Sequence, residues 1–267
     1  MTEAARERIV DKSPERGQGE SEASEGEPHL FELRDPVSSS THLFTCLWAI
    51  FATLLLRRLT RDDYWRRFSV TVFGLSMVIL YAASGLFHAV QLPRESDGFR
   101  IYQKIDKSAI FGLIAGTCTP IMAILLTGWM RKWMLTGIWL MAFAGVACLW
   151  LLPEAPHSAL VGIYLGMGWF GMMGVWQYYK CVGWRGLAWA FAGAAFYTLG
   201  AIIELVQWPV LWPGVVGPHE FLHMSDAIGT FCHFVFIMRY VVAYRPTPAM
   251  TFPLQSISAE RAVALEV

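Results

Sequence analysis

From residue 37 onward, apolar stretches long enough to cross a bilayer, about 20 residues each, alternate with short polar breaks. The breaks include "RRLTRDDYWRR", "PRESDGFRIYQK" and "KCVGWRG". In lipid, a spanning segment must satisfy its own backbone hydrogen bonds, so runs of this length are expected to be helices. The predicted spans are residues 39–56, 68–92, 107–129, 133–152, 158–179, 187–208 and 219–242.

Such short breaks force consecutive helices to run antiparallel. The pattern therefore predicts an all-α integral membrane protein with a seven-transmembrane-helix bundle. We expect a multi-pass protein of the cell membrane, that is, the inner or plasma membrane, with the lipid bilayer as its main partner.

The two ends of the chain have a different pattern. Residues 1–36 are rich in Glu, Ser, Gly and Arg and cannot bury enough apolar surface to fold alone, so we expect a disordered acidic N-terminal tail. No apolar run lies near Met1, so no cleaved signal peptide is expected. The membrane domain then covers 37–243, and a short C-terminal tail covers 244–267.

Composition supports this class of protein. Hydrophobic residues make up 55% of the 267 residues, and 21 basic residues balance 21 acidic ones to a net charge of zero. A neutral chain of this kind argues against a nucleic-acid partner. The five cysteines form no CxxC pair, which gives neither a disulfide framework nor a zinc knuckle.

Polar residues from three separate segments are predicted to meet at one face of the membrane. We name the side of the N-terminus side A and the opposite side B. The second span ends at side A, the third begins there, and the seventh begins there again. This places five residues within a turn or two of the same boundary: Ser84, His88, Asp106, His219 and His223.

These residues fit a metal site. His219 and His223, spaced i and i+4, present two imidazoles from successive turns of one helix face. With His88 they give three neutral nitrogen ligands for zinc and leave a fourth position for water, as in catalytic sites. Asp106 can orient or deprotonate that water, and Ser84 can hydrogen-bond nearby.

Other polar residues in the spans are interpreted differently. His233 lies about 15 Å deeper than His223 by helical rise, too far for the same ion, and we expect it to be a hydrogen-bonded core residue. No partner can be named for His42 or His157. Glu204 either pairs with a lysine, Lys104 or Lys107, or lines the same cavity as the metal.

Three ordered stretches carry a resemblance to a known family. "YAASGLFH", "KIDKSAIFGLIAGTCTP" and "HEFLHMSDAIGTFCHF", with "DPVSSSTHLF" before them, resemble the haemolysin III family. This is the bacterial branch of the progestin and adipoQ receptor superfamily (PAQR, adiponectin receptor-like). The similarity covers roughly residues 35–243.

The resemblance implies a seven-helix fold with zinc bound by His88, His219 and His223, and with Asp106 and Ser84 beside the metal-bound water. It also implies a membrane hydrolase, with ceramidase-like cleavage of a lipid amide in the receptor branch. The chain departs from the family pattern at Lys107, where relatives often have histidine, and at Cys118, where tyrosine is usual. These departures leave the substrate open.

Two arguments about orientation disagree. Side B carries more of the basic residues near span ends: Arg57, Arg58, Arg61, Arg66, Arg67, Arg131, Lys132, Lys180, Arg185, Arg239 and Arg245. Side A carries Arg34, Arg94, Arg100, Lys104 and Lys107. The positive-inside rule would place side B in the cytoplasm, whereas the resemblance places side A there. We expect side A to be cytoplasmic.

Three functions are compatible with these features. The first is a zinc-dependent hydrolase of a lipid amide or ester, supported by the open three-histidine site and Asp106. The second is a receptor or sensor for a lipid-like small molecule, in which zinc is structural. The third is a pore-forming cytolysin, which requires a polar seam through the bilayer; the stripe His223, Asp226, Thr230 and His233 is its only candidate.

Overall fold

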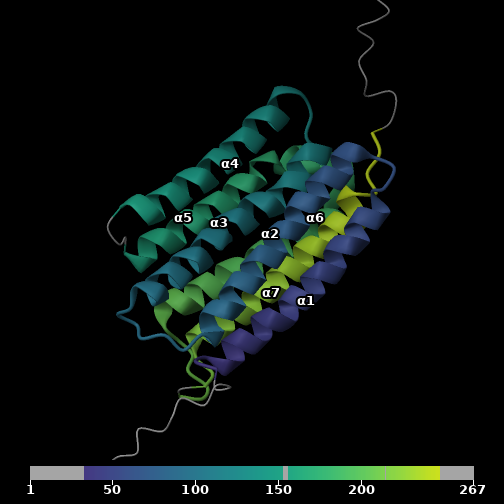
Figure 1. Cartoon of the computed structure of the whole chain (residues 1–267). Coiled ribbons are helices and arrows are strands. Elements are labelled where there is room, and N and C mark those ends of the chain that lie inside the picture. Colours follow the sequence, from purple (N-terminus) through teal and green to yellow (C-terminus); the bar gives the residue numbers. More distant parts are fainter. Residues whose placement is uncertain (1–32, 153–155, 214, 247–267) are drawn as a thin grey trace, which may run out of the picture. The chain divides into compact units, whose positions relative to one another are not determined.

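The computed structural model describes residues 33–152, 156–213 and 215–246 (Figure 1). Within these residues the fold is helical, and the one β-type contact is an isolated bridge between Trp212 and Val216. Most of the predicted acidic tail and of the predicted C-terminal tail lies outside the described residues. The helices are α1 (Pro36–Leu59), α2 (Tyr64–Ala89), α3 (Asp97–Leu125), α4 (Gly128–Leu151), α5 (His157–Phe170), η1 (Gly171–Gly174), α6 (Val175–Val206), α7 (Pro218–Phe236) and η2 (Ile237–Val241).

Helix starts follow from local sequence. The Asp63 carboxylate accepts a hydrogen bond from the Arg66 amide at 3.0 Å, and Ser96 caps α3 in the same way. Helix α7 begins with Pro218 at its first position, where a missing N–H has no cost, and Glu220 accepts from the Gly217 amide at 2.8 Å. The start of α7, which carries the two histidines, is therefore fixed by residues directly around them.

Six helical segments in the described residues are long and apolar enough to cross a membrane. They are Pro36–Leu59, Tyr64–Ala89, Asp97–Leu125, Gly128–Leu151, His157–Val206 and Pro218–Val241. The prediction of an all-α integral membrane protein is confirmed. The count is six, where the sequence pattern predicts seven, and the difference lies in residues 157–206.

This segment of 50 residues turns back on itself. The side chains of His157 and Glu204 lie 3.8 Å apart, whereas one straight helix would separate these residues by about 70 Å. The backbone leaves helical geometry at Gly183, where φ is 65° and ψ is −178°. Glycine alone adopts this conformation readily, so Gly183 provides the break.

The outer surface of the bundle is apolar, as expected for contact with lipid. On α1 the exposed side chains recur at helical spacing and form one stripe: Phe44, Leu47, Phe51 and Leu54. The opposite face of α1 is buried and carries small and polar residues, among them Ala49 and Ala52. Helix α3 contacts α2, α4, α5 and α6, so it lies inside the bundle, whereas α4 buries few residues and lies at its edge (Figure 1).

Polar contacts join the helix ends predicted to lie at side A. The Asp35 carboxylate lies 2.9 Å from Nδ1 of His88, which connects the start of α1 to the end of α2. The Ser38 hydroxyl donates to Glu220 at 3.0 Å and connects α1 to the start of α7. We name this end of the bundle the site end.

Candidate metal centre

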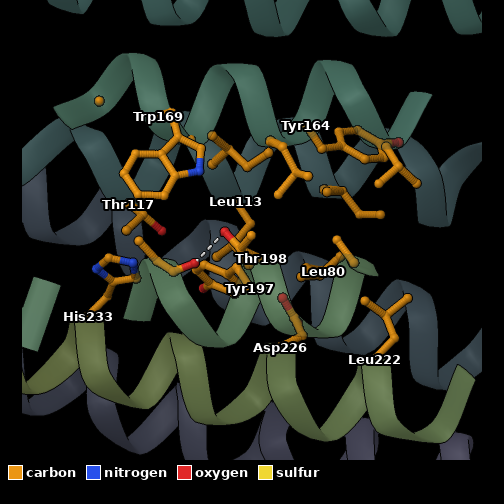
Figure 2. A pocket seen from close by; sticks show the side chains of 18 of the residues that line it. Leu80, Leu113, Thr117, Tyr164, Trp169, Tyr197, Thr198, Leu222, Asp226 and His233 are labelled. Carbon is orange, nitrogen blue, oxygen red and sulfur yellow. Dashed lines mark hydrogen bonds between the residues drawn. The ribbon is translucent and has the colours of Figure 1, made fainter. Parts of the chain in front are cut away.

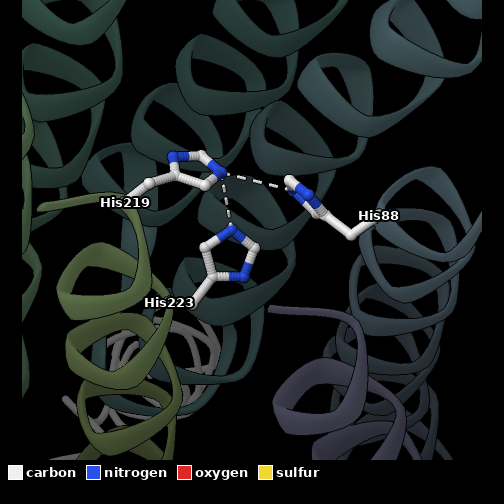
Figure 3. Close-up of side chains that lie close together, drawn as sticks. All are labelled: His88, His219 and His223. Carbon is white, nitrogen blue, oxygen red and sulfur yellow. Dashed lines mark hydrogen bonds between the residues drawn. The ribbon is translucent and has the colours of Figure 1, made fainter. Parts of the chain in front are cut away.

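Three histidines from two helices meet at the site end (Figure 3). His88 is the second-to-last residue of α2, and His219 and His223 lie on successive turns at the start of α7. The Nε2 atom of His219 lies 3.3 Å from Nε2 of His88 and 3.0 Å from Nε2 of His223. One nitrogen from each ring fits within a set whose members all lie within 4.8 Å of one another.

Carboxylates contact the outer nitrogens of two of these rings. The Asp35 carboxylate faces Nδ1 of His88 at 2.9 Å, and the Glu204 carboxylate faces Nδ1 of His219 at 3.4 Å. A carboxylate accepts a hydrogen bond from a ring N–H, so this placement favours the neutral tautomer with its proton on Nδ1, which presents the Nε2 lone pair to the cluster.

Asp35 is held in its ionised form. Burial disfavours the charge, but hydrogen bonds from His88 and Arg34 outweigh burial and hold the pKa of the Asp35 carboxyl group below its usual range. Arg34 donates to the same carboxylate oxygen at 2.9 Å. The charge that fixes the His88 tautomer is therefore itself stabilised by a neighbouring residue.

This arrangement fits a cation. Lone pairs of neutral imidazoles pointing at one another repel, and a metal ion placed among them removes that repulsion. Three histidine nitrogens suit Zn²⁺ and leave one position free. His223 has no hydrogen-bond partner for its Nδ1 among the described residues, and the ring of His42 lies against it with centroids 3.9 Å apart.

Asp106 and Ser84 lie beside the cluster. Asp106, on the third turn of α3, takes the Ser84 hydroxyl as a hydrogen-bond partner, and both side chains line the cavity that also reaches His219 and His223. The structure thus brings together the five residues that the sequence places at one depth.

A cavity of about 260 Å³ extends from this cluster into the bundle. Its wall is predominantly apolar and comes from α1, α2, α3, α5, α6, η1 and α7. In Figure 2, Trp169 and Tyr164 of α5 face Leu222, Asp226 and His233 of α7 across this space. An apolar cavity with few polar groups, next to a cluster of metal-type ligands, can hold the chain of an amphiphile.

Sequence reasoning missed three residues at the site. Asp35 falls inside the segment interpreted as a tail, although its place directly before Pro36 is a typical helix-start signal. His42 and His157 were left without partners, but His42 packs on His223 and His157 lies 3.8 Å from Glu204. Counting helical rise from side A would have placed His42 near the depth of His223.

The structure also defines the surroundings of Glu204 and His233. Glu204 lines the cavity and contacts His219, which agrees with the second of the two alternatives predicted for it. The ammonium group of Lys104 instead lies over the ring of Trp150, at 5.7 Å from its centroid. His233 stacks on Tyr197, with centroids 5.5 Å apart, and its Nδ1 has no hydrogen-bond partner among the described residues. His233 is buried, as expected for a core residue, but the expected hydrogen bond is not made at this nitrogen within the described part of the chain.

Known proteins are similar to this chain over most of its length. The family model described as "Haemolysin-III related" matches residues 32–234. The "Hemolysin-3 homolog" of Bacillus subtilis (strain 168) is 27% identical over 216 residues, which cover 80% of this chain and 97% of the relative. "Hemolysin-3" of Bacillus cereus is 31% identical over 172 residues, covering 64% of this chain and 74% of the relative.

A human relative is also similar along most of its length. "Monocyte to macrophage differentiation factor" of Homo sapiens is 27% identical over 214 residues, which cover 79% of this chain and 85% of the relative. The residues matched by the family model, 32–234, include every side chain of the histidine cluster and both carboxylates behind it.

Proposed function

The chain belongs to the haemolysin III family, within the progestin and adipoQ receptor superfamily, and from this premise we propose that it is a zinc-dependent membrane hydrolase of a lipid amide or ester. The observation that carries the proposal is the three-histidine cluster, with carboxylates behind two of its rings, at one end of an apolar cavity.

Residues 157–206 are proposed to cross the bilayer twice, which makes seven transmembrane helices. The approach of Glu204 to His157 and the non-helical backbone at Gly183 support a hairpin of two antiparallel helices. Each arm has about 25 residues, the length of a single span. An odd number of spans puts the two ends of the membrane domain on opposite sides of the cell membrane.

Zinc is proposed to be held by His88, His219 and His223. When bound, zinc supplies Lewis-acid chemistry, which polarises a scissile carbonyl group and makes a water molecule more acidic. Asp106 then accepts the proton of the attacking water and returns it to the nitrogen or oxygen that leaves. Ser84 donates a hydrogen bond to Asp106 and orients that carboxylate.

The apolar wall of the cavity favours a lipid as the substrate. The acyl chain would lie between α3 and α5 on one side and α6 and α7 on the other, with the bond to be cleaved at the histidines. A ceramidase-like amide is one such substrate, and a lipid ester presents the same carbonyl carbon.

A receptor with structural zinc is the second candidate. It is favoured by the position of the cluster, because His88 and His219 join α2 to α7 and an ion there would hold the bundle together. A pore is not favoured: beyond His233, the described residues that line the cavity are mainly apolar, such as Phe236, Ile121 and Met122.

Metal content and turnover together test the proposal. We expect the purified protein to hold about one zinc per chain, and both His219→Ala and His223→Ala to lose it. Full zinc in both variants would refute the site.

On a panel of lipid amides and esters, Asp106→Asn should keep zinc while turnover falls by a factor on the order of 10²–10⁴. Unchanged turnover would remove Asp106 from this role, and a wild type that is inactive on the whole panel would favour the receptor.

A further inference from the structure

A second group of polar side chains lies deeper in the bundle than the histidines. Asp226 and Tyr197 line the cavity, and the buried Tyr81 and Thr230 contact them. Asp226 is three residues beyond His223 on α7 and so about 4.5 Å farther along the helix axis, and Thr230 is about 10 Å farther. The Tyr81 and Tyr197 hydroxyls lie 2.6 Å and 2.7 Å from the Thr230 hydroxyl. None of these groups is needed to hold or orient the metal.

Hydrogen bonds join these hydroxyl groups to one another and to Asp226. Tyr81 donates to the backbone carbonyl of Asp226 at 3.3 Å and also contacts the Asp226 side chain. Thr230 has one hydroxyl proton for its two tyrosine partners, so at least one of the tyrosines donates to it. The bond to Thr230 is the one that the Tyr197 hydroxyl makes among the described residues, which leaves this hydroxyl able to bond a group in the cavity that it lines.

Asp226 provides an acceptor. Its Oδ2 atom is buried and has no hydrogen-bond partner among the described residues, although the side chain lines the cavity (Figure 2). A carboxyl oxygen that is kept from water without a partner is costly, which points to a ligand group that meets it. Thr117, whose hydroxyl is also buried without a partner, can supply a donor on the opposite wall.

We propose that Asp226 and Tyr197 form a subsite that binds a hydroxyl group carried on the acyl chain of the lipid. The inference rests on the proposed function, since the lipid is the one whose carbonyl group meets the histidines. A ligand hydroxyl group has one proton, which the Asp226 carboxyl oxygen accepts, and its own oxygen accepts from the hydroxyl of Thr117 or Tyr197. Lys107 is the one lysine or arginine among the described lining residues and lies next to Asp106, so an anionic group has no cationic partner at the deep subsite.

Binding of fatty acids, the products of such a hydrolysis, tests the subsite without turnover. The probes are octadecanoic acid and a set of octadecanoic acids with one hydroxyl group at successive chain positions. They are measured against the full chain loaded with zinc and held in lipid nanodiscs. We expect one hydroxyl position to bind on the order of tenfold more tightly than the unsubstituted acid, the contribution of a hydrogen bond to a carboxyl group.

Asp226→Leu and Tyr197→Phe should both remove this preference and leave the affinity for octadecanoic acid unchanged. Tyr197→Phe keeps the ring that stacks on His233 and serves the test if Asp226→Leu does not fold. The matched control is Thr198→Val. Thr198 lines the same cavity, but its hydroxyl already donates to the Ala194 carbonyl at 2.8 Å, so the preference should persist.

The outcomes separate the subsite from the proposed function. Equal affinity of the wild type for all the acids, or a preference that survives both Asp226→Leu and Tyr197→Phe, overturns the subsite. If octadecanoic acid still binds and His219→Ala abolishes its binding, the lipid site at the histidines stands without the subsite. No binding of any acid overturns both.

Discussion

At the scale of single residues, the carboxylates behind the histidines decide which nitrogen is free to bind. Asp35 contacts Nδ1 of His88 and Glu204 contacts Nδ1 of His219. Each fixes one tautomer and makes the inner nitrogen a stronger donor to a metal. The metal affinity of this site should therefore depend on residues that do not touch the ion.

Asp35→Asn and Glu204→Gln should each weaken zinc binding by about 10–100-fold, because they remove the charge but keep the size of the side chain. Competition with a chelator of known affinity measures this effect. Asp62→Asn is the control, since Asp62 is 91% exposed and contacts Arg61. Affinities equal to that of the wild type in both variants would show that the carboxylates do not support the ligands.

The sequence predicts the inner residues of this site better than the outer ones. His219 and His223 stand out by their i, i+4 spacing, and antiparallel spans bring His88 to the same depth. Asp35 is hidden in a run of charged residues at a segment boundary. Glu204 could not be assigned from the sequence, because several charged groups share its depth and only side-chain geometry distinguishes among them.

At the scale of helices, Gly183 is the residue on which the return of the chain depends. Its backbone, with φ of 65° and ψ of −178°, lies in a region that is essentially restricted to glycine. An added Cβ would meet no atom within 4 Å, so any cost of a side chain there comes from the backbone alone.

Gly183→Ala should lower the free energy of unfolding by about 1–3 kcal/mol, the cost of a strained backbone. Thermal unfolding in detergent compares it with Gly162→Ala. Gly162 lies within α5 and also has open space around an added Cβ, but it has helical geometry, so alanine there should be neutral or stabilising. Equal melting temperatures for the two variants would contradict a conformational role of Gly183.

Helix positions were largely predictable, because hydrophobic length reflects bilayer thickness. The predicted spans 39–56 and 68–92 correspond to α1 and α2 within a few residues. The polar break "KCVGWRG" includes Gly183, where the backbone leaves helical geometry, and helical residues lie directly on both sides of it. The sequence could not show how short this turn is, since a long break and a tight bend have the same polar composition.

At the scale of the whole membrane domain, one chain of side-chain contacts crosses the site end. Asp35, His88, His219, Glu204 and His157 follow one another, each within 3.8 Å of the next, and they come from the start of α1 and from α2, α7, α6 and α5. Residues more than a hundred positions apart therefore share one depth. The side of the membrane that the site end faces decides which pool of water reaches the histidine cluster.

Charge and family membership predict opposite orientations for this end. Basic residues are denser at the other end, around Arg57 and Arg66, which would place that end in the cytoplasm. We nevertheless expect the site end to be cytoplasmic, as in the family that the chain resembles.

Cysteines engineered at Glu95 and Asp62 report the two ends, since both residues are exposed and lie in connections on opposite sides. In intact cells an impermeant maleimide should label Asp62→Cys and reach Glu95→Cys only after permeabilisation, with the unmodified chain as the control for its five native cysteines. The reverse pattern would show that the distribution of arginine and lysine sets the orientation.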